Sequence, residues 1–364
     1  MNVVLLHDWL TGFRGGERVL EVFCELFPEA PLYTLIHRPG TTSATIEARK
    51  IQSSFLDQMP GVAKHYRKYL PLFPRAADSL KIIEKADLVL SSSHCVIKGV
   101  KKPEGSTHIS YIHSPMRYLY DQYDAYFGKG APLYQQWGAR VFKNSLTEWD
   151  KNSNQNVDFM IANSLFVQQR IEKYYGRTSD VIHPFVDLID FEQAPLREKK
   201  DFYVVVSAFA PNKRVDLAIK AFNELGLKLV VIGSGQKERE LKEIAGPSIE
   251  FLGNVSRAVV VQKLQEAKAM IFPGVEDFGI TPLEALAAGT PVIAYKKGGV
   301  LETLNDDVSV FFEQADVDSL VEAVKGFEGR KFEKKILKSR ARDFSKEIFK
   351  EKIKTYIEQK VQKK

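Results

Sequence analysis

The chain reads AMIFPGVEDFGITPLEALAAG over residues 269–289. The first four residues are an apolar run that predicts a buried strand, and a Pro-Gly pair ends it. The second half predicts a helix, with Pro282 in its first turn and Gly289 just after its end. Two carboxylates, Glu276 and Glu284, therefore lie on either side of a strand-to-helix turn. Such a turn directs backbone N–H groups and the positive end of a helix dipole at whatever lies in front of it.

The same stretch also fits an ordinary loop with one solvated glutamate and one capping glutamate, because acids are common in first helical turns. The pair Phe278-Gly279 favours a site instead, since a bare connection needs neither a bulky apolar group nor a backbone opening. The rest of the chain also supplies chemical partners for such a site.

A second strand-to-helix turn lies near the N-terminus. Residues 3–6 predict a buried strand, the loop that follows contains Gly15 and Gly16, and the apolar positions after Glu17 have helical spacing. A strand, a glycine-rich loop and a helix form the arrangement that binds phosphate on backbone N–H groups. The loop lacks the third glycine of a dinucleotide fingerprint, so an ordinary turn is the alternative.

Short apolar segments alternate with helical ones through both halves of the chain. This rhythm predicts an α/β protein of two doubly wound, Rossmann-like parallel-sheet domains. We expect an N-terminal domain at residues 1–187, a second domain at 188–343 that starts with a polar hinge, and a terminal helix at 344–364. The predicted strands are 3–6, 87–90, 109–112 and 158–162, then 202–207, 228–232, 249–252, 269–272, 291–295 and 308–312.

Composition narrows the class of protein. A chain of 364 residues, 44% of them hydrophobic, is long enough to bury two cores of ordinary size. The net charge of +6 favours anionic partners, although 52 basic against 46 acidic residues is mostly a mixed, solvated surface. We recognise no nucleic-acid module and expect no nucleic-acid binding.

The two cysteines, Cys24 and Cys95, have no metal-ligand spacing and favour a reduced, cytoplasmic setting. The sequence shows no signal peptide, and no stretch approaches the roughly 18 apolar residues of a spanning helix. Residues 316–318 have the form of a D-x-D metal motif, but a helical pattern follows them, so we expect helix capping and no metal. The turn at 233–235, Gly-Ser-Gly, lacks the third glycine of a cofactor motif.

The spacing of Glu276 and Glu284 resembles the E-x7-E signature of retaining GT-B glycosyltransferases of family 4, and the resemblance covers nearly the full length of the chain. The N-terminal half is most similar to a bacterial, mannosyltransferase-like branch that acts in O-antigen and surface-polysaccharide assembly. The resemblance implies the GT-B fold, in which two Rossmann-like domains face a cleft. It also implies that residues 181–187 are the last N-domain strand and that the terminal helix packs back on that domain.

The resemblance also implies roles for single residues. Glu276 is expected at the donor-sugar hydroxyls, Lys213 at the donor diphosphate, and His113, directly after the strand 109–112, near the sugar. A neutral imidazole there donates or accepts a hydrogen bond and is a poor base; a structural histidine at a strand end is the alternative. The residues expected to bind the donor are Gly15, Gly16, Arg214, Phe278, Gly279, Ile280 and Glu284, the last at the nucleotide ribose.

One position departs from the family pattern. The family has an arginine five residues before Lys213 that also faces the diphosphate, whereas this chain has Ala208. Arg214 is the candidate replacement, but its place next to Lys213 leaves it equally free to point away. The departure leaves open how the second phosphate charge is met.

The family implies a retaining, metal-independent hexosyltransferase that uses no cofactor besides its nucleotide-diphosphate sugar. The expected acceptor is a glycan or a polyprenyl-diphosphate-linked glycan in polysaccharide or lipopolysaccharide assembly, and the branch favours GDP-mannose as the donor. Two alternatives stay open: a protein that binds nucleotide sugars without turnover, which only Ala208 favours, and a nucleotide-sugar hydrolase or phosphorylase on the same fold.

Residues 64–75 read KHYRKYLPLFPR and interleave basic with aromatic side chains. Such a segment suits anionic headgroups and acyl chains, and a lipid-linked acceptor has to be met at a membrane. We therefore expect a peripheral protein on the inner face of the cytoplasmic membrane, with an anionic membrane surface as partner. The alternative is a segment whose aromatic side chains pack on the domain while its charges face water.

Overall fold

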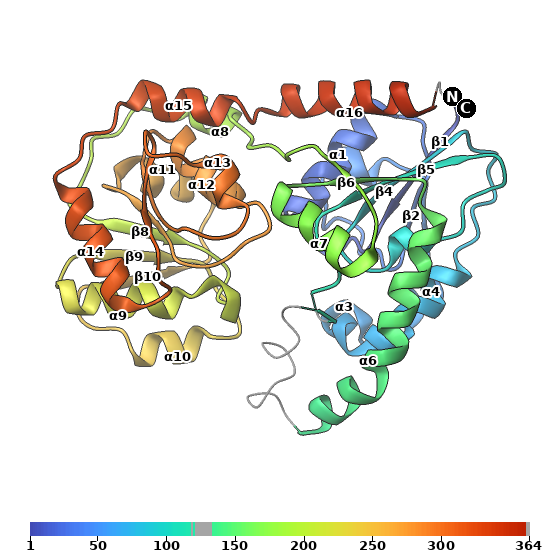
Figure 1. Ribbon diagram of the computed structural model, residues 1–364, viewed down its shortest axis with the longest axis horizontal. Coiled ribbons are helices and arrows are strands. Elements are labelled where there is room, and N and C mark those ends of the chain that lie inside the picture. The colour runs from blue at the N-terminus through green and yellow to red at the C-terminus, as the bar shows by residue number, and fades with distance from the viewer. Residues whose placement is uncertain (118, 121–132, 362–364) are drawn as a thin grey trace. The chain divides into compact units, whose positions relative to one another are not determined.

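The computed structural model describes residues 1–117, 119, 120 and 133–361, apart from the side chains of 63, 64, 67 and 133–140. The chain divides into two compact units, Met1–Ile182 with Lys350–Lys364, and His183–Phe349. Each unit is a parallel β-sheet with helices packed on it (Figure 1). The predicted fold class, two doubly wound α/β domains, is therefore confirmed.

Seven parallel strands form the sheet of the first unit, in the order β3-β2-β1-β4-β5-β6-β7. The strands are β1 (Val3–His7), β2 (Leu32–Thr34), β3 (Ile51–Ser53), β4 (Leu88–Ser93), β5 (Thr107–Ile112), β6 (Phe159–Ala162) and β7 (Asp180–Val181). The helices are α1 (Gly15–Leu26), α2 (Ala44–Glu47), α3 (Val62–His65), α4 (Phe73–Ser79), α6 (Leu133–Ser153) and α7 (Leu165–Tyr175), with 3₁₀ helices η1 (Phe55–Gln58), η2 (Tyr66–Leu72), η3 (Ile97–Gly99) and η4 (Asn154–Asn156).

Six parallel strands form the second sheet, in the order β10-β9-β8-β11-β12-β13. The strands are β8 (Tyr203–Val206), β9 (Leu229–Ile232), β10 (Ile249–Gly253), β11 (Met270–Phe272), β12 (Val292–Tyr295) and β13 (Ser309–Phe312). The helices are α8 (Ile189–Gln193), η5 (Pro211–Lys213), α9 (Val215–Leu225), α10 (Glu238–Glu243), α11 (Arg257–Glu266), α12 (Ile280–Ala287), α13 (Val300–Thr303), α14 (Val317–Glu328) and α15 (Lys334–Arg342). The terminal helix α16 (Lys346–Val361) begins in this unit and continues in the first.

The second sheet shows why its strands read as unbroken apolar runs. Successive side chains of a strand point to opposite faces. In β8, Tyr203 and Val205 join a core with α9, α10 and α14, whereas Val204 joins the core on the other face with α11, α12 and α15. Because helices cover both faces, three successive residues of β8 are buried and only Val206 is partly exposed, so this strand lacks the alternating pattern of a half-exposed sheet.

Both sheets reverse their strand order at one place. The strands β1 and β4 are neighbours in the first sheet, and β8 and β11 in the second, although other strands separate them along the chain. The chain leaves such a pair of strands in opposite directions, and ligands of open α/β sheets bind outside the carboxyl ends at this switch point. The loops after these four strands are therefore where a site is expected.

The observed boundaries differ in detail from the predicted ones. Strand β7 ends at Val181, and farther along the predicted strand the N–H of Val186 donates to the carbonyl of Phe344 instead of to the sheet. The first unit ends at Ile182, five residues before the predicted boundary at 187. Residues 350–361 of α16 pack in the first unit, where the hydroxyl of Tyr356 donates to Asp180 at 2.8 Å. No helix of the described chain is long and apolar enough to cross a membrane.

His108 is a buried histidine of β5 whose two ring nitrogens are both engaged. Nδ1 lies 2.9 Å from the carbonyl oxygen of Asn156 and donates to it, so Nε2, 2.9 Å from Oγ of Ser91, acts as the acceptor. A second ring proton would have to replace that accepted bond. Burial lowers the pKa of His108 to about 4.

Acid should therefore destabilise the first unit. Between about pH 6.5 and pH 4 the unfolded chain binds a proton at His108 that the folded chain does not. As the pH is lowered through that window, the free energy of unfolding therefore decreases, by on the order of 3 kcal/mol for this group. In His108→Gln the loss should be smaller. All three tryptophans fall within residues 1–182, so tryptophan fluorescence in urea measures this unit alone. An equal pH dependence of the two urea midpoints would contradict the assignment.

Candidate functional site

The carboxylate of Asp8 organises the switch point of the first unit. Asp8 directly follows β1 and is fully buried. Its oxygens accept hydrogen bonds from four successive backbone N–H groups, those of residues 94–97, at 2.7 to 2.9 Å. These residues follow β4, so one side chain joins the ends of the two central strands. Burial opposes the charge, but His94 and the backbone donors hold the pKa of Asp8 below its ordinary value.

Three histidine rings lie beside this carboxylate. The ring centroids of His7 and His94 are 5.8 Å apart, and those of His94 and His113 are 6.3 Å apart. The backbone of Gly16 lies against two of the rings, because a Cβ atom there would be 3.5 Å from Cε1 of His7 and 3.7 Å from Nε2 of His113. The fold thus brings together two residues that the sequence predicts for one site, Gly16 and His113.

Glu17 fixes the glycine loop from within the first turn of α1. One of its oxygens accepts the N–H of Arg14 at 2.9 Å, and the other lies 3.8 Å from Nε2 of His7. Burial would raise the pKa of Glu17, but the adjacent His7 and then His94 lower it to about 2. In the described chain neither ring nitrogen of His7 has a hydrogen-bond partner. Sequence reasoning missed Glu17, His7, Asp8 and His94 as site residues. The available signal was the polar pair His7-Asp8, which directly follows the apolar residues 3–6.

His113 lies at the carboxyl end of β5, partly exposed. Its Nε2 is 2.8 Å from Oγ of Ser92, and its backbone N–H donates to the carbonyl of Ser93. Burial, followed by the neighbouring His94 and His7, lowers the pKa of His113 to about 3. The ring is therefore neutral near pH 7, where it donates or accepts a hydrogen bond but is a poor base. Its expected contact with a sugar stays a prediction.

Lys213 and Glu276 meet at the switch point of the second unit. They belong to the loops after β8 and β11, and Nζ of Lys213 lies 2.5 Å from Oε1 of Glu276. Both side chains are about four-fifths buried, with 19% and 20% of their surface exposed. The fold therefore places a cation and an anion, predicted for the two halves of one ligand, in direct contact.

Glycines let three loops pack backbone against backbone around Glu276. A Cβ atom at Gly299 would lie 2.1 Å from the carbonyl oxygen of Asp277, and one at Gly274 would lie 2.5 Å from that of Asn212. The N–H of Gly299 donates to the carbonyl of Glu276 at 3.0 Å. Residues with side chains do not fit at these two glycines, so the position of the Glu276 carboxylate depends on them.

Glu284, the second acid of the E-x7-E pair, lies on α12 and is bound to an arginine. Its Oε1 is 2.6 Å from Nη1 of Arg257, whose Nε is 2.9 Å from Oδ2 of Asp190. The guanidinium also lies 5.0 Å from the ring centroid of Phe191. Sequence reasoning missed Arg257, because nothing distinguishes it in the sequence from the other arginines of helices.

The side chain of Phe278 belongs to the core of the second unit. It is 3% exposed, its ring stacks on that of His183 at 5.5 Å, and it packs on Phe344. An apolar ring in a short loop has more to gain from the core than from solvent, so Phe278 positions the loop and leaves only its backbone for a donor. Gly279 has φ +87 and caps α12, which starts at Ile280, so the N–H groups of the first turn follow the loop as predicted.

Arg214 is the candidate replacement for the arginine expected at Ala208. Nε of Arg214 lies 3.2 Å from Oδ1 of Asp216, a residue of the helix that Arg214 caps, so its guanidinium is engaged by its own helix. Arg214 has φ +49, the left-handed region that favours glycine. Ala208 follows β8 and is exposed. The position that holds arginine in the family therefore has open space around its side chain.

The apolar side chains of residues 64–75 pack on the first unit. The rings of Tyr66 and Trp9 are 5.0 Å apart, Phe73 is buried, and Tyr69 lies against the same core. The basic side chains Lys68 and Arg75 are exposed, whereas those of residues 64 and 67 lie outside the described residues. The alternative of aromatic side chains packed on the domain is the one observed.

The two motif look-alikes are structural. A Cβ atom at Gly233 would lie 1.9 Å from the carbonyl oxygen of Ser207, so the Gly-Ser-Gly turn is packed against the loop after β8. Asp316 accepts the N–H of Ser319 at 2.9 Å and caps α14. Among the described residues, no group of three or more His, Cys, Asp or Glu side chains is placed to hold a metal ion. The expected independence from metals and cofactors stays a prediction.

Comparison with known families finds a match within the second unit. Residues 187–344 match the family model described as glycosyl transferases group 1. The chain is 29% identical over 209 residues to alpha-1,3/1,6-mannosyltransferase ALG2 of Saccharomyces cerevisiae, a match that covers 42% of this chain and 41% of that one. It is 33% identical over 132 residues to a GDP-mannose-dependent phosphatidylinositol monomannoside mannosyltransferase of Corynebacterium glutamicum, covering 32% and 35%. The chain thus spans less than half of the length of either relative.

Solved structures of glycosyltransferases share the fold. The apo lipopolysaccharide outer core galactosyltransferase WaaB superposes with a TM-score of 0.68 at 16% identity, covering 99% of this chain and all of the other. Sucrose-phosphate synthase from Thermosynechococcus elongatus superposes with a TM-score of 0.74 at 15% identity, covering both chains completely. Together with the two parallel sheets, these neighbours confirm the predicted GT-B class of fold; the assignment to family 4 stays a prediction.

Restoring the missing arginine should strengthen the binding of a nucleoside diphosphate. Because Ala208 is exposed at the carboxyl end of β8, Ala208→Arg adds a guanidinium without displacing core atoms. One charge-assisted contact to phosphate is worth on the order of 1.5–3 kcal/mol, so GDP affinity measured by calorimetry should rise at least about tenfold. Lys213→Ala removes one positive charge from the same expected phosphate site and should weaken GDP binding by a similar factor. Weaker binding by Ala208→Arg would show that another group already meets that charge.

Proposed function

We propose, from the glycosyl transferases group 1 domain at residues 187–344, that this protein transfers a hexose from a nucleotide-diphosphate sugar to a glycan acceptor. The observation that carries the proposal is the contact of Lys213 with Glu276 at the switch point of the second unit. An ammonium group suits the diphosphate, and a carboxylate accepts hydrogen bonds from sugar hydroxyls. The pair therefore offers complementary groups for the two halves of a nucleotide sugar.

The proposed transfer breaks the bond between the anomeric carbon and the phosphate oxygen and forms a bond from that carbon to the acceptor hydroxyl oxygen. Negative charge grows on the diphosphate as it leaves. Lys213 and the N–H groups of Gly279 and Ile280 stabilise that charge, and one preorganised donor is worth on the order of 3 kcal/mol of barrier. The acceptor attacks the face from which the diphosphate departs, which retains the configuration, and the leaving phosphate takes the hydroxyl proton.

We infer that neither a divalent metal nor a further cofactor takes part, because an ammonium group and backbone N–H donors meet the charge of the diphosphate. The roles of the other residues follow the same chemistry. Glu276 orients the sugar, Glu284 with Arg257 behind it holds the ribose, and the neutral ring of His113 offers one hydrogen bond to a hydroxyl group.

Mannose is the proposed sugar and GDP-mannose the proposed donor. Both curated relatives named above are mannosyltransferases, and the name of the Corynebacterium protein states its dependence on GDP-mannose. That name also specifies a phosphatidylinositol mannoside, which supports an acceptor glycan carried on a lipid. A polyprenyl-diphosphate-linked glycan is the acceptor that we propose.

Glu276→Gln tests the proposal, because it keeps the volume of the side chain and removes its charge. Transfer of labelled mannose from GDP-mannose to a lipid-linked glycan should fall at least about a hundredfold, since the interaction acts on the reacting sugar. GDP binding should persist or tighten, because Lys213 loses its carboxylate partner. Glu322→Gln, an exposed glutamate of α14, is the control and should leave both quantities unchanged. Transfer by Glu276→Gln within threefold of the wild type would remove Glu276 from the reaction.

The same assay separates the two other functions. Release of free mannose with and without acceptor identifies a hydrolase, and formation of a sugar phosphate in the presence of phosphate identifies a phosphorylase. Tight binding of GDP-mannose with no product identifies a binding protein; the exposed Ala208 is the one feature in its favour.

We propose that any membrane contact of residues 64–75 is electrostatic. Lys68 and Arg75 are exposed, whereas the aromatic side chains that would enter a bilayer are packed on the first unit. Each basic side chain near an anionic leaflet contributes on the order of 1 kcal/mol, and salt screens the attraction. Under this proposal, the protein meets a lipid-linked acceptor at the membrane surface.

Reversal of these charges should release the protein from anionic vesicles. Lys68→Glu with Arg75→Glu should reduce sedimentation with phosphatidylglycerol vesicles severalfold at low salt, and high salt should do the same to the wild type. Lys296→Glu with Lys325→Glu makes the same change of net charge on exposed lysines of the second unit and serves as the control. Equal losses in the two double variants would assign the effect to net charge instead of to this segment.

A further inference from the structure

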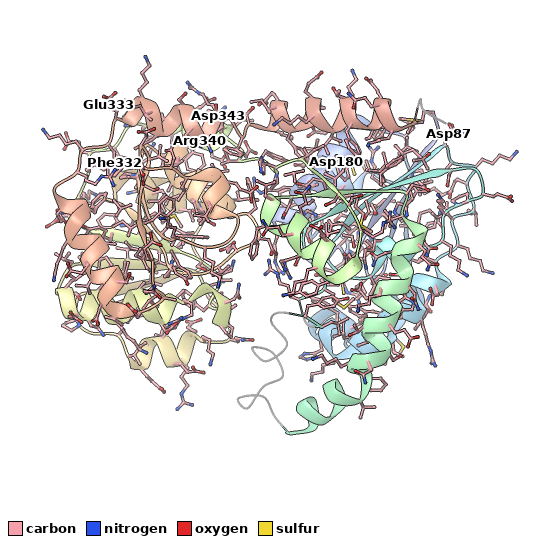
Figure 2. All side chains as sticks on the ribbon, viewed as in Figure 1. Asp87, Asp180, Phe332, Glu333, Arg340 and Asp343 are labelled. Atoms are coloured by element: carbon pink, nitrogen blue, oxygen red, sulfur yellow. The ribbon has the colours of Figure 1, made fainter. Side chains whose placement is uncertain are left out.

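A cavity of about 420 Å³ opens in the second unit at the end of the sheet opposite to Lys213 and Glu276. Its lining includes Lys268, just before β11, and Gly289 and Pro291, just before β12. The rest of the wall comes from the hinge at 197–199, the end of α14 and the start of α15. Figure 2 shows Phe332 and Glu333 where the chain enters α15. The volume lies in the range of small-molecule sites.

The wall of this cavity is strongly basic. Five of its eleven lining residues are basic and one, Glu328, is acidic. Glu328 is already paired with Lys268 at 2.5 Å, and the guanidinium of Arg330 donates to the carbonyl of Asp306 at 2.6 Å. Besides Arg330, the basic side chains that pair with no carboxylate of the described residues are Arg197, Lys199 and Lys334.

Two of these three basic side chains are held in place by contacts with the second unit. Nζ of Lys199 donates to the carbonyl of Ala267 at 2.8 Å and to Oγ1 of Thr290 at 2.5 Å, which leaves one of its three N–H groups for a ligand. The aliphatic chain of Lys334 lies across Gly289, where a Cβ atom would come within 2.8 Å of Cγ and Cε. Gly289 also has φ +76, so the position favours glycine for two independent reasons.

We propose that this cavity is a second anion site, which binds a phosphate-bearing ligand. Ammonium and guanidinium groups are the side chains that bind phosphate, and Arg197 presents two parallel N–H donors where the lysines present point charges. Cations that share one cavity repel one another, and a bound anion removes that repulsion. The site is separate from the proposed donor residues, because α12, about 12 Å long, starts beside the Glu276 loop and ends before Gly289.

Inorganic pyrophosphate is a suitable probe, and the protein to use is Lys213→Ala, so that the proposed donor residues do not compete. Calorimetry at constant ionic strength, set with sodium chloride, should show one pyrophosphate site. Adding Lys334→Met to this background should weaken binding at least about tenfold, because the lysine leaves and the apolar chain over Gly289 remains. Lys335→Met removes the next lysine of α15, which does not line this cavity, and should change the affinity less than twofold.

Lys199→Met is the second variant, and its folding is checked by its melting temperature, because Lys199 also bonds to Ala267 and Thr290. Equal pyrophosphate affinity in the Lys334→Met and Lys335→Met proteins, or no binding in the Lys213→Ala background, would overturn the proposal. Competition by phosphatidylglycerol vesicles, but not by phosphatidylcholine vesicles, would identify the phosphate as that of a lipid headgroup. Absence of competition would identify a soluble phosphate ligand.

Discussion

One carboxylate holds the switch point of the first unit together. Asp8 accepts four consecutive N–H groups from the loop after β4, and without them a charge with no access to water would cost several kcal/mol. The four N–H groups also gain hydrogen-bond acceptors, since in a loop that leaves a sheet they have no strand to pair with. The position of His94, and through it of the rings of His7 and His113, follows from this exchange.

In the second unit, close backbone contacts hold the loops of the switch point. Its loops approach so closely that Gly274 and Gly299 are in contact with the backbone of neighbouring loops, and the N–H of Gly299 bonds to the carbonyl of Glu276. Backbone packing of this kind leaves the side chains of Lys213 and Glu276 partly exposed instead of consuming them in the structure. The first unit uses its polar side chains to hold loops, whereas in the second, under the proposed function, Lys213 and Glu276 stay available to a ligand.

The sequence was informative where local pattern determines structure. Apolar runs predicted the strands, because strands covered on both faces are mostly apolar, and Pro282 with Gly289 delimited α12. It was uninformative where partners are distant. The bonds from Asp8 span 86 to 89 residues, and Arg257 reaches Glu284 across 27. Phe278 was assigned to the donor, whereas for the aromatic residues of 64–75 both a membrane contact and packing on the domain stayed open. An apolar side chain in a loop is equally suited to a core, and only the tertiary structure decides.

The contact between Lys213 and Glu276 makes ligand entry an exchange of partners. In this structure Lys213 and Glu276 are each other's counterion. An incoming molecule therefore gains only the difference between its own contacts and the contact that it replaces. A nucleotide sugar, under the proposed function, returns a partner to both residues: phosphate to the lysine and hydroxyl groups to the glutamate. A nucleoside diphosphate returns a partner only to the lysine, and Glu276 then competes for the ammonium group at close range. The two side chains that are proposed to bind the substrate would therefore also promote release of the nucleoside diphosphate product, which favours turnover over product inhibition.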